Sequence, residues 1–179
     1  MKKNVDPLHP IRLYFVDALA QTLHDRLGMP DEPEVEGYLT DLMVQFMYND
    51  ALHQFRHPDG RQLSLIEMLE HGDVRLQADS FEQEREVYRQ IGDLVLFWTG
   101  LFPEALEGAA GSGALVGYPE QGQYAYHVVS TFDHPPYTDE APVFRRLSEG
   151  FVTYQHSLKM VRASFEGFAR QGWSDGFSA

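Results

Sequence analysis

The chain has 179 residues, no cysteine and a formal net charge of −13, with 14 lysines and arginines against 27 aspartates and glutamates. Its length predicts one domain, large enough to bury a core without disulfide support. The lack of cysteine excludes disulfides, thiolate metal ligands and a cysteine nucleophile.

The negative charge and the lack of long apolar segments limit the partners that we expect. A net charge of −13 repels nucleic-acid phosphates and anionic lipids. No apolar segment follows Lys2 and Lys3, as it would in a signal peptide. No run approaches the roughly 18 apolar residues that a membrane span needs. We therefore expect a cytoplasmic protein with no nucleic-acid or membrane partner.

Apolar periodicity predicts two helices in the first third of the chain. Apolar residues recur mostly at three- and four-residue steps over residues 11–27, and Gly28 ends that helix. The second helix begins at residues 31–34, where acidic side chains suit the positive end of a helix. This second helix cannot continue past Pro58.

Capping-box sequences predict the next two helices. Residues 64–67 open a short helix that ends near Gly72. Residues 80–83 open a long helix that runs to about Phe102. The second half of this long helix is apolar on nearly all sides, so we expect it to be buried by several neighbours.

Glycine and proline divide the next part of the chain. Residues 107–117 are rich in glycine and alanine and predict a mobile loop. A shorter helix with an apolar stripe follows over residues 118–132. Residues 133–142 contain three prolines, which exclude regular structure there.

The last predicted helix carries a heptad seam. Eight apolar side chains recur at alternating three- and four-residue steps: Phe144, Leu147, Phe151, Tyr154, Leu158, Val161, Phe165 and Phe168. This repeat is typical of left-handed supercoiled helices. Gly150, Ser157 and Ser164 form a small-residue flank beside it. The helices that pack on the seam belong either to the same chain or to a second copy.

These elements predict an all-α fold, a single-domain bundle of about six helices over residues 1–170. The long heptad-patterned C-terminal helix is expected to be central or nearly so. Residues 171–179 form a polar, glycine-rich tail.

One set of residues has the spacing of a metal site. Asp50, His53 and His57 would share one face of a helix, and two imidazoles with a carboxylate can bind a divalent metal. Pro58 disturbs helical geometry at His57, so the alternative is a solvated polar face at a helix end.

Asp93 is the strongest candidate for a specific polar role, because it lies where the long helix becomes apolar. A buried carboxylate must be paired, hydrogen-bonded or protonated. Its role is either structural, in contact with Arg89 or with a loop N–H, or functional, as an acid or ligand anchor in a pocket.

Tyrosines and histidines gather in the following helix and loop. With Asp93, they are candidates to line a ligand cleft: Tyr118, Tyr126, His127 and His134. Tyr126 lies on the apolar stripe, so its alternative role is in the core. His127 lies off the stripe, so its alternative is full solvation.

Signatures of common enzyme classes are missing. The sequence has no Walker loop, no complete dinucleotide fingerprint and no paired Glu-x-x-His motifs of di-iron bundles. We therefore expect no cofactor. The leading hypothesis is a non-enzymatic interaction or structural module that forms a homodimer through its helices. The alternative is a small-molecule-binding protein or enzyme with a polar pocket around Asp93 and residues 118–137.

Two stretches, about a tenth of the chain, are similar to a pattern in an uncharacterised bacterial family of all-helical proteins. They are Gly92-Asp93-Leu94-Val95-Leu96-Phe97-Trp98-Thr99-Gly100-Leu101-Phe102-Pro103-Glu104 and Gly122-Gln123-Tyr124-Ala125-Tyr126. The resemblance implies a helical fold and no particular activity. It also favours a specific role for the Gly92-Asp93 step.

Overall fold

The computed structural model describes residues 10–48, 80–103 and 117–175, with side chains outside 46–48 and 166–175. The all-α fold is confirmed, since every regular element in these ranges is a helix. The elements are α1 (Pro10–Ala20), η1 (Gln21–Arg26), α2 (Pro33–Tyr48), α4 (Phe81–Leu101), α6 (Tyr118–Ser130), α7 (Ala141–Glu149) and α8 (Phe151–Asp175).

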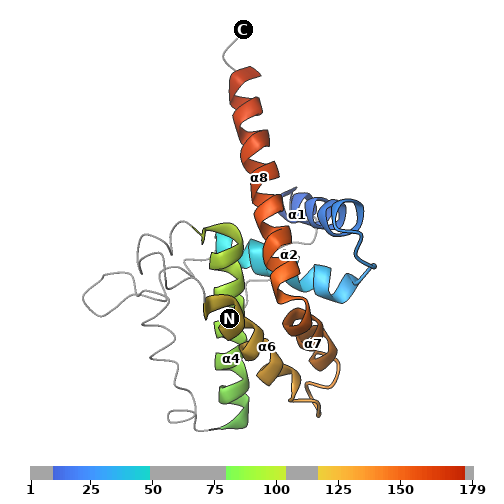
Figure 1. Cartoon of the computed structure of the whole chain (residues 1–179), viewed down its shortest axis with the longest axis vertical. Helices are drawn as coiled ribbons and strands as arrows, with labels where there is room; N and C mark the ends of the chain where they lie inside the picture. Colours follow the sequence, from blue (N-terminus) through green and yellow to red (C-terminus); the bar gives the residue numbers. More distant parts are fainter. Residues whose placement is uncertain (1–9, 49–79, 104–116, 176–179) are drawn as a thin grey trace, which may run out of the picture.

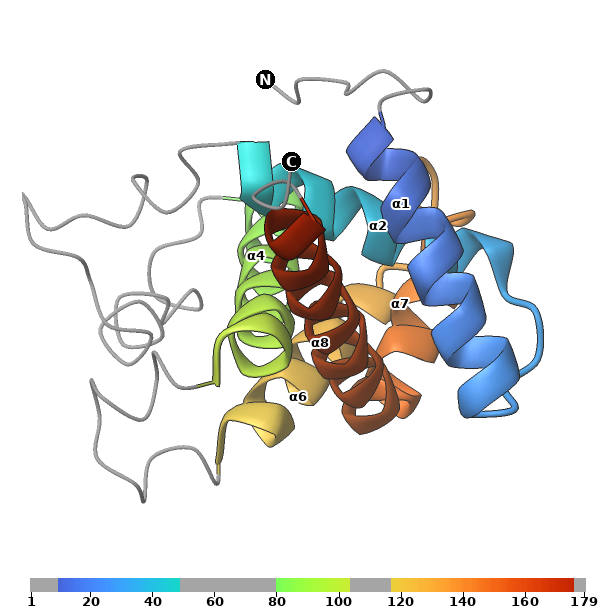
Figure 2. The same cartoon turned by 90° about the horizontal axis from the view of Figure 1, so that it is seen from above.

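Helix α8 occupies a central position among the described helices (Figure 1). It contacts α1, η1, α4, α6 and α7, while α4 packs most extensively on α6, and α1 on α2. The view from above shows α8 between α4 and α1 (Figure 2). The expected central position of the C-terminal helix is therefore observed.

The prediction of one continuous C-terminal helix is wrong, because the chain bends at Gly150. This residue ends α7, and its N–H donates to the carbonyl of Arg146 at 2.9 Å. Its own carbonyl accepts from the N–H of Tyr154 at 3.0 Å as α8 begins. Its φ of −96° is open to other residues, but an added Cβ atom would lie 2.6 Å from a ring carbon of Tyr154, so the close approach of that ring requires glycine.

The apolar seam crosses this bend and is used inside the single chain. Phe144 and Leu147 belong to α7, and the next four seam residues, Phe151 to Val161, belong to α8. All six side chains are at most 2% exposed. Phe165 is partly exposed and contacts the ring of Tyr14 at 5.6 Å between centroids. The seam to Val161 is therefore not a free surface for a second copy.

Local signals placed several helix ends correctly. Ser80 caps α4, its Oγ accepting from the N–H of Gln83 at 3.2 Å. Gly28 ends the first helical segment with φ of +64°. That segment is not uniformly α-helical, because its last part, η1, is a π-helix. Helix α8 continues through Asp175, so residues 171–175 of the predicted tail are helical.

Other predictions lie outside the described residues. They are the short helix from residue 64, the loop at 107–116, the end of the tail at 176–179 and the metal set of Asp50, His53 and His57. Within the described ranges, no helix combines the length and the apolar character needed to cross a membrane.

Two glycines allow α4, α6 and α8 to approach closely. A Cβ atom on Gly92 of α4 would lie 2.5 Å from a ring carbon of Tyr126 on α6. A Cβ atom on Gly122 of α6 would overlap the ring of Phe151 and lie 2.9 Å from Val95. Because core atoms are already close-packed, neither position has room for a methyl group.

We expect Gly122→Ala to lower the free energy of unfolding by about 2 kcal/mol, since overpacking outweighs the better helix propensity of alanine. The matched control is Gly37→Ala in α2, where a new Cβ meets nothing within 4 Å. This control should raise stability by about 0.5–1 kcal/mol. Urea denaturation measures both. Equal effects of the two substitutions would contradict the close approach of the helices.

Candidate functional site

Asp93 lies at the centre of a buried polar network that joins three helices. Its Oδ1 accepts hydrogen bonds from the hydroxyls of Tyr38 on α2 at 2.5 Å and Tyr126 on α6 at 2.9 Å. Its Oδ2 accepts from Nη1 of Arg89, one turn earlier on α4, at 2.7 Å. Only 6% of Asp93 is exposed. Both carboxylate oxygens therefore have protein donors.

Arg89 links this carboxylate to the protein surface. Its Nε and Nη2 donate to the two carboxylate oxygens of Glu86 at 2.9 and 2.5 Å. The Glu86 side chain is 45% exposed, whereas that of Arg89 is 12% exposed. The guanidinium is thus held in a fixed orientation between a half-exposed and a buried carboxylate, which is the bidentate geometry that arginine favours.

The pKa values in this network follow from burial and from these bonds. Burial raises the pKa of Asp93, against the opposing effects of the Arg89 charge and the two tyrosine hydroxyls. Burial lowers the pKa of Arg89, but its bonds to Glu86 and the charge of Asp93 raise it more. Burial and the nearby Asp93 charge raise the pKa of Tyr38 and of Tyr126. Both phenols therefore remain protonated donors.

The arrangement supports a structural role for Asp93. The contact with Arg89 that the sequence favoured is present, and two tyrosine hydroxyls add to it. Tyr38 was not among the sequence candidates, although it shares the apolar face of α2 with Val35 and Leu42. Its partner lies 55 positions away, so only the tertiary fold reveals the pair.

Of the five ligand-binding candidates, the structure brings Asp93 and Tyr126 into contact. Tyr118 is buried two turns earlier on α6, about 12 Å away along the helix axis. Burial raises the pKa of Tyr118.

His127 is exposed and lines a separate cavity of about 280 Å³ with Arg145. His134 is exposed in the turn after α6, and its Nδ1 lies 3.1 Å from the carbonyl of Pro135. The predicted cluster is therefore dispersed.

A groove lies between α4 and α6, separate from the cavity that His127 lines. Its volume is about 290 Å³, and it is lined by Tyr88, Ile91, Glu120, Gln121, Tyr124 and Ala125. Tyr88 and Tyr124 meet edge to face, with ring centroids 6.1 Å apart. Asp93 does not line this groove, so the groove is not the polar pocket predicted around that residue.

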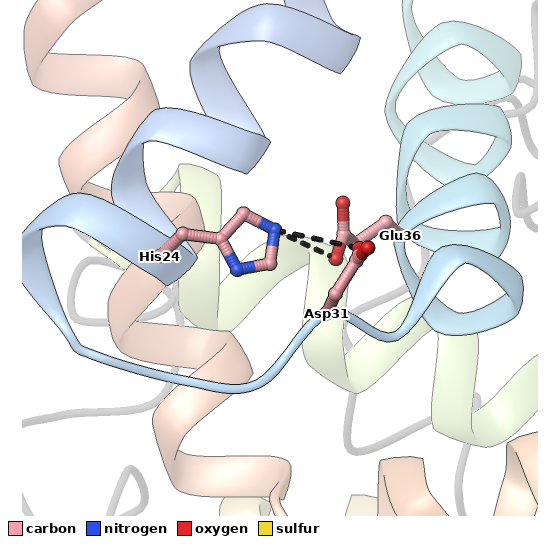
Figure 3. A group of neighbouring side chains, drawn as sticks. All are labelled: His24, Asp31 and Glu36. Carbon is pink, nitrogen blue, oxygen red and sulfur yellow. Dashed lines mark ion pairs between the residues drawn. The ribbon is translucent and has the colours of Figure 1, made fainter.

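A second polar group, absent from the sequence candidates, lies where η1 meets the start of α2 (Figure 3). Nε2 of His24 is 3.0 Å from Oε1 of Glu36 and 3.9 Å from Oδ1 of Asp31. One ligand atom from each residue lies within 4.8 Å of the others. The hydrogen bond between His24 and the Met29 carbonyl, together with the two carboxylates, raises the pKa of His24.

The turn at Gly28 brings these residues together. It reverses the chain after the π-helix, so His24 of η1 faces Asp31 before α2 and Glu36 in the first turn of α2. π-Helical segments are rare and often occur at functional sites. The signals in the sequence were the helix-ending glycine and the acids after it. A histidine one turn before such a glycine is expected near the next helix entry.

Comparisons of the chain with protein-family models, curated proteins and solved structures found no match. The candidate sites therefore rest on their own geometry.

We expect Asp93→Asn to lower the free energy of unfolding by about 3 kcal/mol, because it removes the buried partner of Arg89 and leaves that charge only the half-exposed Glu86. The control is Asp41→Asn, which removes an ion pair to Arg12 in which the aspartate side chain is 68% exposed. Exposed pairs contribute about 0–1 kcal/mol. Chemical denaturation compares the two variants, and similar losses would argue against the structural role of Asp93.

Proposed function

We propose that the chain is a non-enzymatic interaction module that forms a homodimer through the C-terminal end of α8. One observation carries the proposal: the last turns of α8 extend beyond every other described helix (Figure 1). Short helices are only marginally stable in water without tertiary contacts. A second copy that packs along this projecting end would supply them.

The use of the seam within the chain supports this location for the interface. The seam side chains from Phe144 to Val161 are buried by the chain's own helices. Contacts with a second copy must therefore involve other surfaces, and the projecting end of α8 is the part of the described backbone most free to make them. The proposal keeps the cytoplasm as the compartment, and the charge of −13 disfavours nucleic acid as a partner.

The Asp93 network supports a non-catalytic role. A general acid or base must reach a proton on its substrate. Both oxygens of Asp93 are occupied by donors from the chain, and the residue is almost fully buried. The residue with the strongest sequence signal for chemistry is thus used to hold helices together.

The second candidate function is the binding of a small molecule in the groove between α4 and α6. Its volume of about 290 Å³ is near the lower end of ligand pockets. Two tyrosines and an isoleucine offer an apolar surface, and Glu120 and Gln121 line the groove mainly with carbon atoms. Such a ligand would be small and mainly apolar.

Native mass spectrometry on the protein purified from cells distinguishes these functions. We expect a mass of twice 20.5 kDa with no organic molecule bound. A stoichiometric additional organic mass would instead favour the groove. A bare monomer at micromolar concentration would contradict the dimer.

Deletion of residues 166–179 tests the proposed interface. The truncated chain keeps the contact of Phe165 with Tyr14, so we expect a folded monomer. The control is Val152→Glu, which changes a residue that is 61% exposed on α8 within the bundle. This control should remain dimeric. Analytical ultracentrifugation measures the state of each, and a truncated chain that stays dimeric would place the interface elsewhere.

A further inference from the structure

The group at the start of α2 has the composition of a metal site. It offers one imidazole nitrogen from His24 and two carboxylate oxygens from Asp31 and Glu36. It is the one such group of three among the described residues. Imidazole suits transition metals such as zinc, and carboxylates complete many of their sites.

The spacing of the three atoms suits a single ion. Ligand atoms around tetrahedral zinc lie about 3.3 Å apart, as metal–ligand distances near 2 Å require. The His24–Glu36 and His24–Asp31 separations are 3.0 and 3.9 Å. The Asp31 side chain is 84% exposed, so it can rotate to close the longer gap without disturbing the core.

The surroundings hold two of the ligands in place. Nδ1 of His24 lies 3.1 Å from the carbonyl of Met29. In the neutral imidazole, donation to this carbonyl places the proton on Nδ1 and leaves the lone pair on Nε2, the atom that would bind a metal in place of a proton, as is usual for metal-binding histidines. Oε1 of Glu36 accepts from the N–H of Glu32 at 3.1 Å. Glu32 is itself anchored, since its Oε2 accepts from the hydroxyl of Tyr154 on α8 at 2.7 Å.

The group also has access to solvent. His24 lines a cavity of about 420 Å³ together with Tyr14, Asp17, Gln21 and Ser164. A metal ion needs an entry path as well as ligands. Three protein ligands leave a fourth tetrahedral position for water or for a bound molecule.

We propose that His24, Asp31 and Glu36 bind a divalent transition-metal ion, with Zn²⁺ as the test ion. The ion joins η1 to α2 across the turn at Gly28. The site is independent of the proposed homodimer, because none of its residues belongs to α8.

Isothermal titration calorimetry with Zn²⁺ on the full chain tests this site after treatment with a chelator. We expect one ion per chain. His24→Gln and Glu36→Gln should each weaken binding at least about tenfold, since even outer-shell changes at metal sites cost 10–100-fold. Asp31→Asn should weaken binding too. Because the Asp31 side chain is 84% exposed, this substitution should leave the fold intact, and weaker binding would then reflect the loss of a ligand.

Two controls separate this site from other imidazoles. His134→Gln removes an exposed histidine whose Nδ1 also lies 3.1 Å from a backbone carbonyl. The double variant His53→Gln/His57→Gln removes the pair predicted from sequence. Both should bind Zn²⁺ as the parent chain does. The proposal is overturned if the parent chain binds no stoichiometric Zn²⁺ at 0.1 mM metal (roughly the range of a useful site), or if His24→Gln and Glu36→Gln bind it unchanged.

Discussion

The buried carboxylate of Asp93 is the constraint on which the rest of this bundle depends. A desolvated charge is tolerated in a protein interior only when it is paired and fully hydrogen-bonded. Here the pairing comes from Arg89 of the same helix, and the remaining bonds come from Tyr38 on α2 and Tyr126 on α6. A shift of either neighbouring helix along α4 would leave the carboxylate short of a donor. The network therefore fixes the register of three helices more sharply than apolar contacts alone would.

The packing around Asp93 follows from the same requirement. Gly92 has no side chain, and this allows the Tyr126 ring to lie close against α4, with its hydroxyl in reach of the carboxylate. The ring of Tyr126 in turn packs against Phe144 and Phe151, with centroids 5.7 and 5.9 Å away. The first two aromatic residues of the C-terminal seam are thus part of the shell around the network. This explains why the seam faces inward on both sides of the bend at Gly150.

The features predicted correctly from the sequence are those that depend on residues close together in the chain. The cap at Ser80, the end at Gly28 and the apolar second half of α4 each depend on a few neighbouring residues. The bend at Gly150 was missed, because seam residues on both sides of it point into the same core, and periodicity does not record backbone direction. Asp93 was found from its apolar surroundings, but Tyr38 was not. The group of His24, Asp31 and Glu36 was missed because it forms only when the Gly28 turn brings η1 against α2.

Helix α2 takes part in both polar groups, and its geometry keeps them separate. Tyr38 bonds to Asp93, while Glu36, two positions earlier, faces His24. Residues two apart on a helix point to different sides, since each residue turns by about 100°. An ion at Glu36 would therefore hold η1 against α2 without competing for the donors around Asp93. The buried group is saturated by its own chain and serves the fold, whereas the second group is partly exposed, and one of its residues, His24, lines a cavity. The Asp93 group is buried and all its hydrogen bonds are made within the chain, so we assign it a structural role. The His24 group is more exposed, so we propose metal binding there.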